Sequence, residues 1–154
     1  MRIFLTGFMG AGKSTVGRLL SQILNLEFVD LDTEIEMLAG RHIAGIFEDL
    51  GEQEFRDLER KCLEASPENA IIATGGGCFI FNTDWMLANG TTVYLKVPFE
   101  VLASRIGADP SRPLWKNAQK LFLQREAVYQ KAQVIVDASP EPDQVAITIR
   151  SKLP

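Results

Sequence analysis

The sequence predicts a single α/β domain over residues 1–154 with three layers, in which a five-stranded, mostly parallel sheet is flanked by helices. Short apolar runs alternate with amphipathic stretches along the chain, which is the pattern of βα units. Two of these runs, RIFLT and AIIAT, are continuously apolar, as expected for strands that are covered on both faces. The length of 154 residues suffices for one compact core and is short for two ordinary domains.

The strands are predicted from short apolar runs that lie between turn signals. In chain order they are Arg2–Thr6, Glu27–Val29, Ala70–Thr74, Thr92–Val97 and Gln133–Val136.

Helices are expected between these strands, and several of their ends carry a signal. Thr33 and Glu36 have the spacing of a capping box, and Gly40 follows as a stop. Ser139 before Pro140 has the form of an N-cap and a first helical residue. The expected helices are Lys13–Leu24, Thr33–Ala39, Ile43–Leu50, Glu52–Ala65, Pro98–Arg105, Ala118–Lys131 and one that starts at Ser139.

The segment 106–115, IGADPSRPLW, has no hydrophobic period and contains two prolines. It is longer than the usual connection in a compact domain, so it is a candidate for a mobile lid over a binding site. An ordinary surface loop is the alternative.

Composition and charge limit the possible functions. The net charge of −4 argues against non-specific binding to nucleic acid or to an anionic membrane. No stretch approaches the roughly 18 apolar residues of a membrane span, and the apolar run at the N-terminus is too short for a signal peptide, so we expect a cytoplasmic protein. The two cysteines, Cys62 and Cys78, are expected to be small buried residues in a reducing compartment.

The segment Gly7–Ser14, GFMGAGKS, fits the phosphate-binding pattern GxxxxGK[ST] between an expected strand and an expected helix. Its glycines let the backbone turn N–H groups toward a phosphate, where the helix N-terminus adds partial positive charge. Lys13 is expected to reach the β- and γ-phosphates, and the Ser14 hydroxyl is expected to bind Mg²⁺. A glycine-rich turn without a ligand is the alternative. The predicted fold is therefore of the P-loop NTPase type, and the predicted ATP-binding residues here are Gly10, Ala11, Gly12, Lys13, Ser14 and Thr15.

The phosphate loop does not define the reaction. A switch GTPase would need an NKxD motif for base recognition, which the sequence lacks, and a motor ATPase would normally be larger. The length suits a small-metabolite kinase.

Two aspartates, Asp30 and Asp32, follow the second strand, at the sheet edge where open α/β sheets bind ligands. Asp32 is a candidate acceptor for a substrate hydroxyl, and Asp30 is a candidate for holding a Mg²⁺-bound water. The alternative is that both carboxylates only favour the positive end of the following helix.

Further residues suggest a pocket for an anionic substrate. Arg56 lies on an amphipathic helix, where an i, i+3 pair with Glu59 would hold its guanidinium. The glycines Gly75–Gly77 follow the third strand and can expose backbone N–H groups to a ligand, although a plain tight turn is the alternative. Arg125 lies on another amphipathic helix, where a lone arginine usually faces solvent.

In combination, these motifs resemble the shikimate kinase family. GFMGAGKST, FVDLDTEIE, GEQEFRDLE, IIATGGG, SRPLW and LQREAVY occur in the order and spacing of that family and cover nearly the whole chain. The resemblance implies an ATP-dependent, Mg²⁺-requiring kinase that phosphorylates the 3-hydroxyl of shikimate, a step of the chorismate and aromatic amino acid pathway. Two departures occur: RPLW stands where RPLL is commoner, and no basic residue follows the last strand to contact adenine.

The resemblance also implies a role for each site residue. Asp32 would hold the reacting hydroxyl, Asp30 would belong to the outer shell of Mg²⁺, and Gly76 would be the likeliest substrate contact among Gly75–Gly77. Arg56 and Arg125 would bind the shikimate carboxylate. The resemblance further implies a lid at about 106–117, from which Arg112 would contact the phosphates, and it implies that Arg105 would lie along the adenine. It also implies a substrate-binding segment at about 31–62, which Ile43, Phe47 and Phe55 would line.

Other functions remain open at this point. Gluconate kinases and nucleoside-monophosphate kinases share the phosphate loop and a lid, and a nucleotide-binding regulator without turnover would share the loop alone. A regulator would not need Asp32, Arg56 and Arg125 together. The expected partners are ATP and shikimate, with no nucleic acid or membrane, and the sequence gives no signal for an oligomer, so a monomer is expected.

Overall fold

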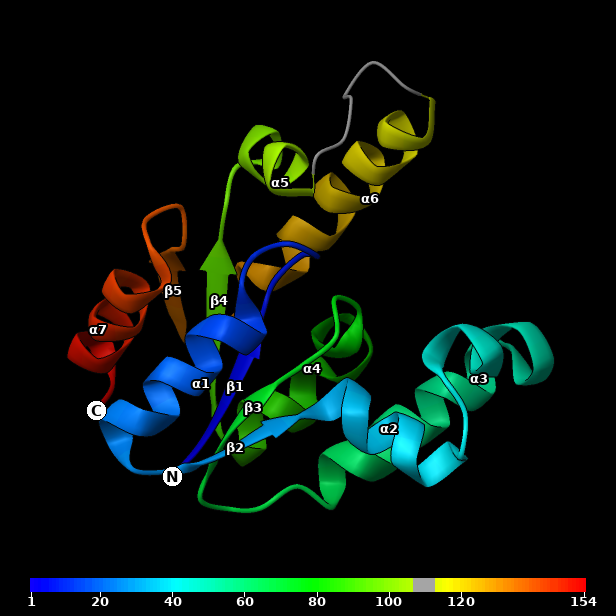
Figure 1. The fold of residues 1–154 in the computed structure, drawn as a ribbon, viewed down its shortest axis with the longest axis horizontal. Helices are drawn as coiled ribbons and strands as arrows, with labels where there is room; N and C mark the ends of the chain where they lie inside the picture. Colours follow the sequence, from blue (N-terminus) through cyan, green and yellow to red (C-terminus); the bar gives the residue numbers. More distant parts are fainter. Residues whose placement is uncertain (107–112) are drawn as a thin grey trace.

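The computed structural model describes the backbone of residues 1–106 and 113–154, and the side chains of these residues except 113–116. Within these residues it contains seven helices and one sheet of five strands in the order β2-β3-β1-β4-β5 (Figure 1). All four strand pairings are parallel, which confirms the α/β fold expected from the sequence.

The strands agree with the sequence analysis to within one residue at each end. They are β1 (Arg2–Thr6), β2 (Glu27–Asp30), β3 (Ala70–Ala73), β4 (Thr91–Lys96) and β5 (Val134–Asp137). Because the sheet is parallel, the carboxyl ends of all these strands meet at one edge. The loops that follow β1 and β3, and the start of α2 directly after β2, therefore converge at this edge, which is where ligands bind in open α/β sheets.

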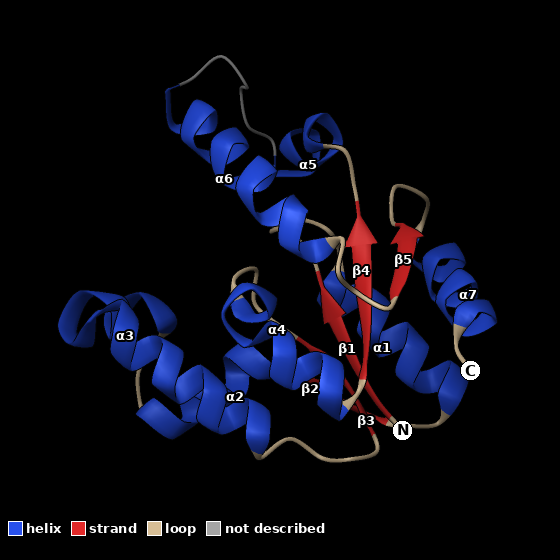
Figure 2. Ribbon diagram, turned by 180° about the vertical axis from the view of Figure 1, so that it is seen from behind, coloured by secondary structure: helices blue, strands red, loops and turns tan. Residues whose placement is uncertain are grey.

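Helices cover both faces of the sheet (Figures 1 and 2). Helices α1 and α7 lie together on one face, α4 and α6 lie on the other, and α2 and α3 pack against each other beside β2. The helices are α1 (Lys13–Leu24), α2 (Leu31–Ala39), α3 (Ile43–Glu64), α4 (Cys78–Asn89), α5 (Phe99–Ile106), α6 (Pro113–Tyr129) and α7 (Pro142–Lys152). No helix in the described part of the chain is both long and apolar enough to cross a bilayer.

The prediction that a capping box at Thr33 starts α2 was wrong. The helix starts at Leu31, and the Asp30 carboxylate accepts hydrogen bonds from the backbone N–H groups of Asp32 and Thr33. An aspartate caps a helix as well as a threonine does, and Asp30 comes first in the chain. Glu36 instead accepts a hydrogen bond from the backbone N–H of Ile43, at the start of α3.

Other helix boundaries also differ from the expected ones. The two helices predicted on either side of Gly51 form one element, α3, with a non-helical Gly51 inside it. Helix α6 starts at Pro113 rather than at Ala118, so 113–115 belong to a helix and not to the expected loop at 106–115. Proline is tolerated in a first helical turn. The last helix has Glu141 rather than Ser139 as its N-cap, with Pro142 in its first turn.

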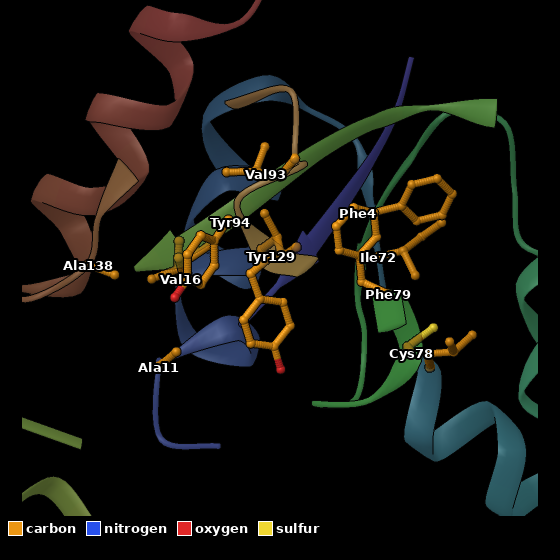
Figure 3. Packing of buried hydrophobic residues seen from close by; sticks show 14 of the residues in the cluster. Phe4, Ala11, Val16, Ile72, Cys78, Phe79, Val93, Tyr94, Tyr129 and Ala138 are labelled. Atoms are coloured by element: carbon orange, nitrogen blue, oxygen red, sulfur yellow. The ribbon is translucent and has the colours of Figure 1, made fainter. Parts of the chain in front are cut away.

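The core fills both sides of the sheet and supports the site edge. β1 and β3 are almost fully buried, as the continuous apolar runs predict. The largest fully buried side chains are Tyr94 and Tyr129, whose rings lie side by side (Figure 3). Both cysteines are free thiols, with Cys78 buried and Cys62 half-buried.

Candidate active site

The phosphate loop connects β1 to α1, as the sequence predicts. Gly10 and Gly12 have positive φ angles of 83° and 94°, a left-handed conformation that favours glycine and curls the backbone. The Lys13 ammonium lies inside this curl, where Nζ donates to the carbonyl oxygens of Gly7 at 2.5 Å and Phe8 at 3.2 Å. A phosphate bound by the loop would therefore meet a preformed positive charge.

Charge and burial shift the pKa values of the two central side chains in opposite directions. Burial lowers the pKa of Lys13 to about 8, although the carboxylate of Asp32 works against the shift. Burial raises the pKa of Asp32, and the nearby Asp30 carboxylate raises it further. Lys13 and Asp32 therefore lie within electrostatic range of each other at the carboxyl edge of the sheet.

The Lys13→Met substitution is expected to change how stability depends on pH. The pKa of Lys13 falls from 10.5 to about 8 in the folded protein, so between these values the folded protein binds fewer protons than the unfolded chain. Wild-type stability should therefore rise with pH over this window relative to the variant, which has no such group. Denaturant unfolding of both nucleotide-free proteins between about pH 7 and pH 10 measures this difference. A difference that stays constant across the window would contradict the burial of the ammonium.

Ser14 and Asp30 face each other across the start of α1 and the end of β2. The Ser14 hydroxyl donates to Asp30 Oδ2 at 3.2 Å, while Oδ1 of the same carboxylate caps α2. Capping leaves one carboxylate oxygen directed at the phosphate loop. The described residues contain no group of three or more His, Cys, Asp and Glu side chains that could hold a metal by themselves.

The glycine loop after β3 brings the three predicted substrate residues together. A Cβ atom placed on Gly75 would lie 3.1 Å from Oδ1 of Asp32. On Gly76 it would lie 3.1 Å from Nη1 of Arg125, and on Gly77 it would lie 2.7 Å from Nη2 of Arg56. Each glycine thus leaves room for one functional side chain, and the alternative of a plain tight turn does not explain this correspondence. One aspartate and two arginines, from α2, α3 and α6, surround the same short segment.

Arg56 is held in one position by its surroundings. Its Nη1 donates to Oε1 of the buried Glu59 at 3.0 Å, which confirms the predicted i, i+3 pair. The guanidinium also lies over the ring of Phe81, at 4.1 Å, and over that of Phe55, at 5.0 Å. An arginine that is fixed in this way is arranged to bind an anion with little loss of side-chain entropy.

The family model described as shikimate kinase matches residues 9–154. The chain belongs to the shikimate kinase family. The shikimate kinase of Sulfurihydrogenibium sp. (strain YO3AOP1) is 41% identical over 160 residues, which cover 98% of this chain and 96% of that protein. The crystal structure of shikimate kinase from Aquifex aeolicus matches with a TM-score of 0.88 and 41% identity, covering 98% of this chain and 94% of that one. Shikimate kinase from Acinetobacter baumannii, solved in complex with shikimate, matches with a TM-score of 0.86 and 34% identity over 99% and 95% of the two chains.

In this family member, Arg105 joins the phosphate loop to the segment after β5. Its Nη1 donates to the carbonyl oxygen of Gly10 at 3.1 Å, and its Nη2 donates to that of Ala138 at 2.7 Å. A pocket of about 330 Å³ opens between these elements and is lined by Gly12, Arg105 and Pro140, among others. The segment after β5 contributes Ala138–Pro142 to the lining of this pocket and includes no basic residue, so the sequence carried no recognisable signal for it.

The predicted lid residue Arg112 lies outside the described residues. Of the residues expected to line the substrate segment, Phe55 is buried and Phe47 is partly exposed, and their rings lie 4.6 Å apart. Ile43 is half-buried at the start of α3.

Proposed function

We propose that this shikimate kinase family member transfers the γ-phosphoryl group of ATP to the 3-hydroxyl of shikimate, giving ADP and shikimate 3-phosphate. The observation that carries the proposal is the gathering of Asp32, Arg56 and Arg125 around the glycine loop, next to the phosphate loop. Shikimate has one carboxylate and several hydroxyls, so its chemistry matches two cations, one carboxylate and exposed backbone N–H groups.

In this proposal, Arg56 and Arg125 bind the substrate carboxylate. Each hydrogen bond to a charged group contributes about 1.5–3 kcal/mol, and the two guanidiniums approach from different helices. An uncharged analogue would place a neutral group against the two guanidiniums and would form none of these charge-assisted hydrogen bonds. The pair therefore selects for an acid.

Asp32 receives the substrate hydroxyl, and Gly75–Gly77 hold the ring from the other side. The raised pKa of Asp32 makes its carboxylate a better proton acceptor than an exposed aspartate. Phosphoryl transfer passes through a loose transition state, so positioning and charge neutralisation supply most of the catalysis. Lys13, inside the phosphate loop, and Arg112 are the proposed cations for the developing charge on the phosphates.

The oxygen atoms of Ser14 and Asp30 fit Mg²⁺, which takes one or two protein ligands beside phosphate oxygens and water. Ser14 would bind the ion directly and Asp30 would hold one of its waters. When bound, the ion neutralises phosphate charge.

The remaining assignments complete the proposal. The adenine is proposed to lie along Arg105, in the pocket next to the phosphate loop. We propose a single domain over residues 1–154, with a substrate-binding segment at about 31–62 and a lid at about 106–117 that includes the first residues of α6. The protein is proposed to act in the cytoplasm as a monomer.

A coupled assay of ADP release against a panel of acceptors tests the proposal. Shikimate should support ADP release in the presence of Mg²⁺, whereas gluconate and nucleoside monophosphates should not. Turnover of gluconate would favour the sugar-acid kinase alternative. Nucleotide binding without turnover of any acceptor would favour the regulator.

A further inference from the structure

Tyr129 is the last residue of α6, one helical turn after Arg125. Its side chain is fully buried, and its ring packs on that of Tyr94 with centroids 4.9 Å apart (Figure 3). Because the Tyr129 ring is buried and stacked on Tyr94, its position is fixed, and so is that of the phenolic oxygen. Tyr129 therefore presents its hydroxyl group at a fixed point at the carboxyl edge of the sheet.

This hydroxyl joins two parts of the site. It donates a hydrogen bond to the carbonyl oxygen of Gly76, and the guanidinium of Arg125 lies close enough to lower the pKa of the phenol. A Cβ atom on Gly76 would lie 3.9 Å from the hydroxyl oxygen and 3.1 Å from Nη1 of Arg125, so all three groups are in close contact. Burial raises the pKa of Tyr129 to about 12, so the hydroxyl keeps its proton and remains a donor.

The hydrogen bond to Gly76 also orients a peptide unit. No peptide bond in the described residues is cis, so the carbonyl of Gly76 and the N–H of Gly77 point in opposite directions. That N–H donates no hydrogen bond within the described part of the chain. Three consecutive glycines restrict the backbone dihedral angles very little. A contact from another part of the protein is therefore needed to fix the orientation of the peptide plane between Gly76 and Gly77.

We propose that Tyr129 is a positioning residue for the substrate: its hydroxyl keeps the Arg125 guanidinium directed at the substrate carboxylate and aims the Gly77 N–H at the ring hydroxyls. This inference rests on the proposed function and adds a residue to it. Without the hydroxyl, the Gly76 carbonyl loses its donor, and Arg125 is the nearest replacement. The arginine would then turn toward the loop and away from the substrate.

Tyr94 provides a matched control. It is a second buried tyrosine in contact with the first, and its hydroxyl has no hydrogen-bond partner in the described residues. A Tyr→Phe change at either position removes one oxygen from the same stacked pair. Only the change at Tyr129 removes a contact to the site.

The test compares wild type, Tyr129→Phe and Tyr94→Phe in the shikimate-dependent ADP-release assay, with thermal melting of all three. The KM for shikimate should rise about tenfold in Tyr129→Phe, because Arg125 and the glycine loop are then no longer held in the binding geometry, while the KM for ATP stays within about twofold. Tyr94→Phe should match wild type in both constants.

The outcomes separate the two proposals. An unchanged KM for shikimate in Tyr129→Phe, with active wild type, overturns this inference and leaves the proposed function standing. Equal rises in both KM values, together with a lowered melting temperature, also overturn it, because they indicate a purely structural role. Wild-type protein that does not turn over shikimate overturns the proposed function and this inference with it.

Discussion

The Asp32→Asn variant is expected to lose about 10²- to 10⁴-fold in kcat, the usual contribution of a group that positions and accepts a proton in the transition state. The KM for ATP should remain close to that of wild type, because the phosphate loop keeps all its groups.

Burial and Asp30 raise the pKa of Asp32, so the ionised form destabilises the fold as the pH rises past its unfolded pKa. The neutral amide lacks this cost, so the variant should melt no lower than wild type.

Steady-state kinetics with both substrates checks this prediction. Asp57→Asn is the matched control, because Asp57 lies on the exposed face of α3, where it accepts a hydrogen bond from Gln53 at 2.9 Å. It should have wild-type kcat. Normal turnover in Asp32→Asn would remove Asp32 from its assigned role.

The Arg56→Ala variant is expected to have a KM for shikimate about 10- to 100-fold higher than wild type, which corresponds to one or two lost hydrogen bonds between charged groups. Its ATP affinity should not change. The same substitution leaves Glu59 buried without its partner, and burial already raises the pKa of that carboxyl. The variant should therefore also be less stable, by an amount typical of a broken buried ion pair, about 3–5 kcal/mol.

Two further variants separate substrate binding from this loss of stability. Arg56→Lys keeps a charge beside Glu59 but loses the planar fork, so it should fold well and still bind shikimate more weakly than wild type. Arg60→Ala removes an arginine from the next turn of α3, which contacts Glu64 and Asn82. It should retain the wild-type KM. Equal losses of shikimate and ATP affinity in Arg56→Lys would contradict a carboxylate-binding role.

The sequence predicts those parts of the fold that depend on local signals. The strand boundaries follow from apolar runs, and the start of α1 follows from the phosphate-loop pattern. Helix α4 lacks a prediction because its apolar residues occur on most of its sides, so no helical period stands out over Cys78–Asn89. The start of α2 was missed because Asp30 and Thr33 both have the side chain of a cap, and only the three-dimensional arrangement decides between them.

The composition of the candidate site is predicted better than its geometry. The resemblance to shikimate kinases implies that Asp32 and Arg56 belong to one pocket, and the i, i+3 spacing gives the pair of Arg56 with Glu59. It does not reveal that each glycine of the loop faces a different functional side chain, since that depends on how α2, α3 and α6 pack. Tyr129 is missed for the same reason, because a buried tyrosine at the end of an amphipathic helix has the pattern of an ordinary core residue.

A crystal structure of the protein with shikimate and a non-hydrolysable ATP analogue tests the central claim most directly. The account predicts that the shikimate carboxylate contacts both Arg56 and Arg125, and that the 3-hydroxyl lies about 3 Å from the Asp32 carboxylate and faces the terminal phosphate. Shikimate bound away from the glycine loop, or bound with its carboxylate distant from both arginines, would contradict it.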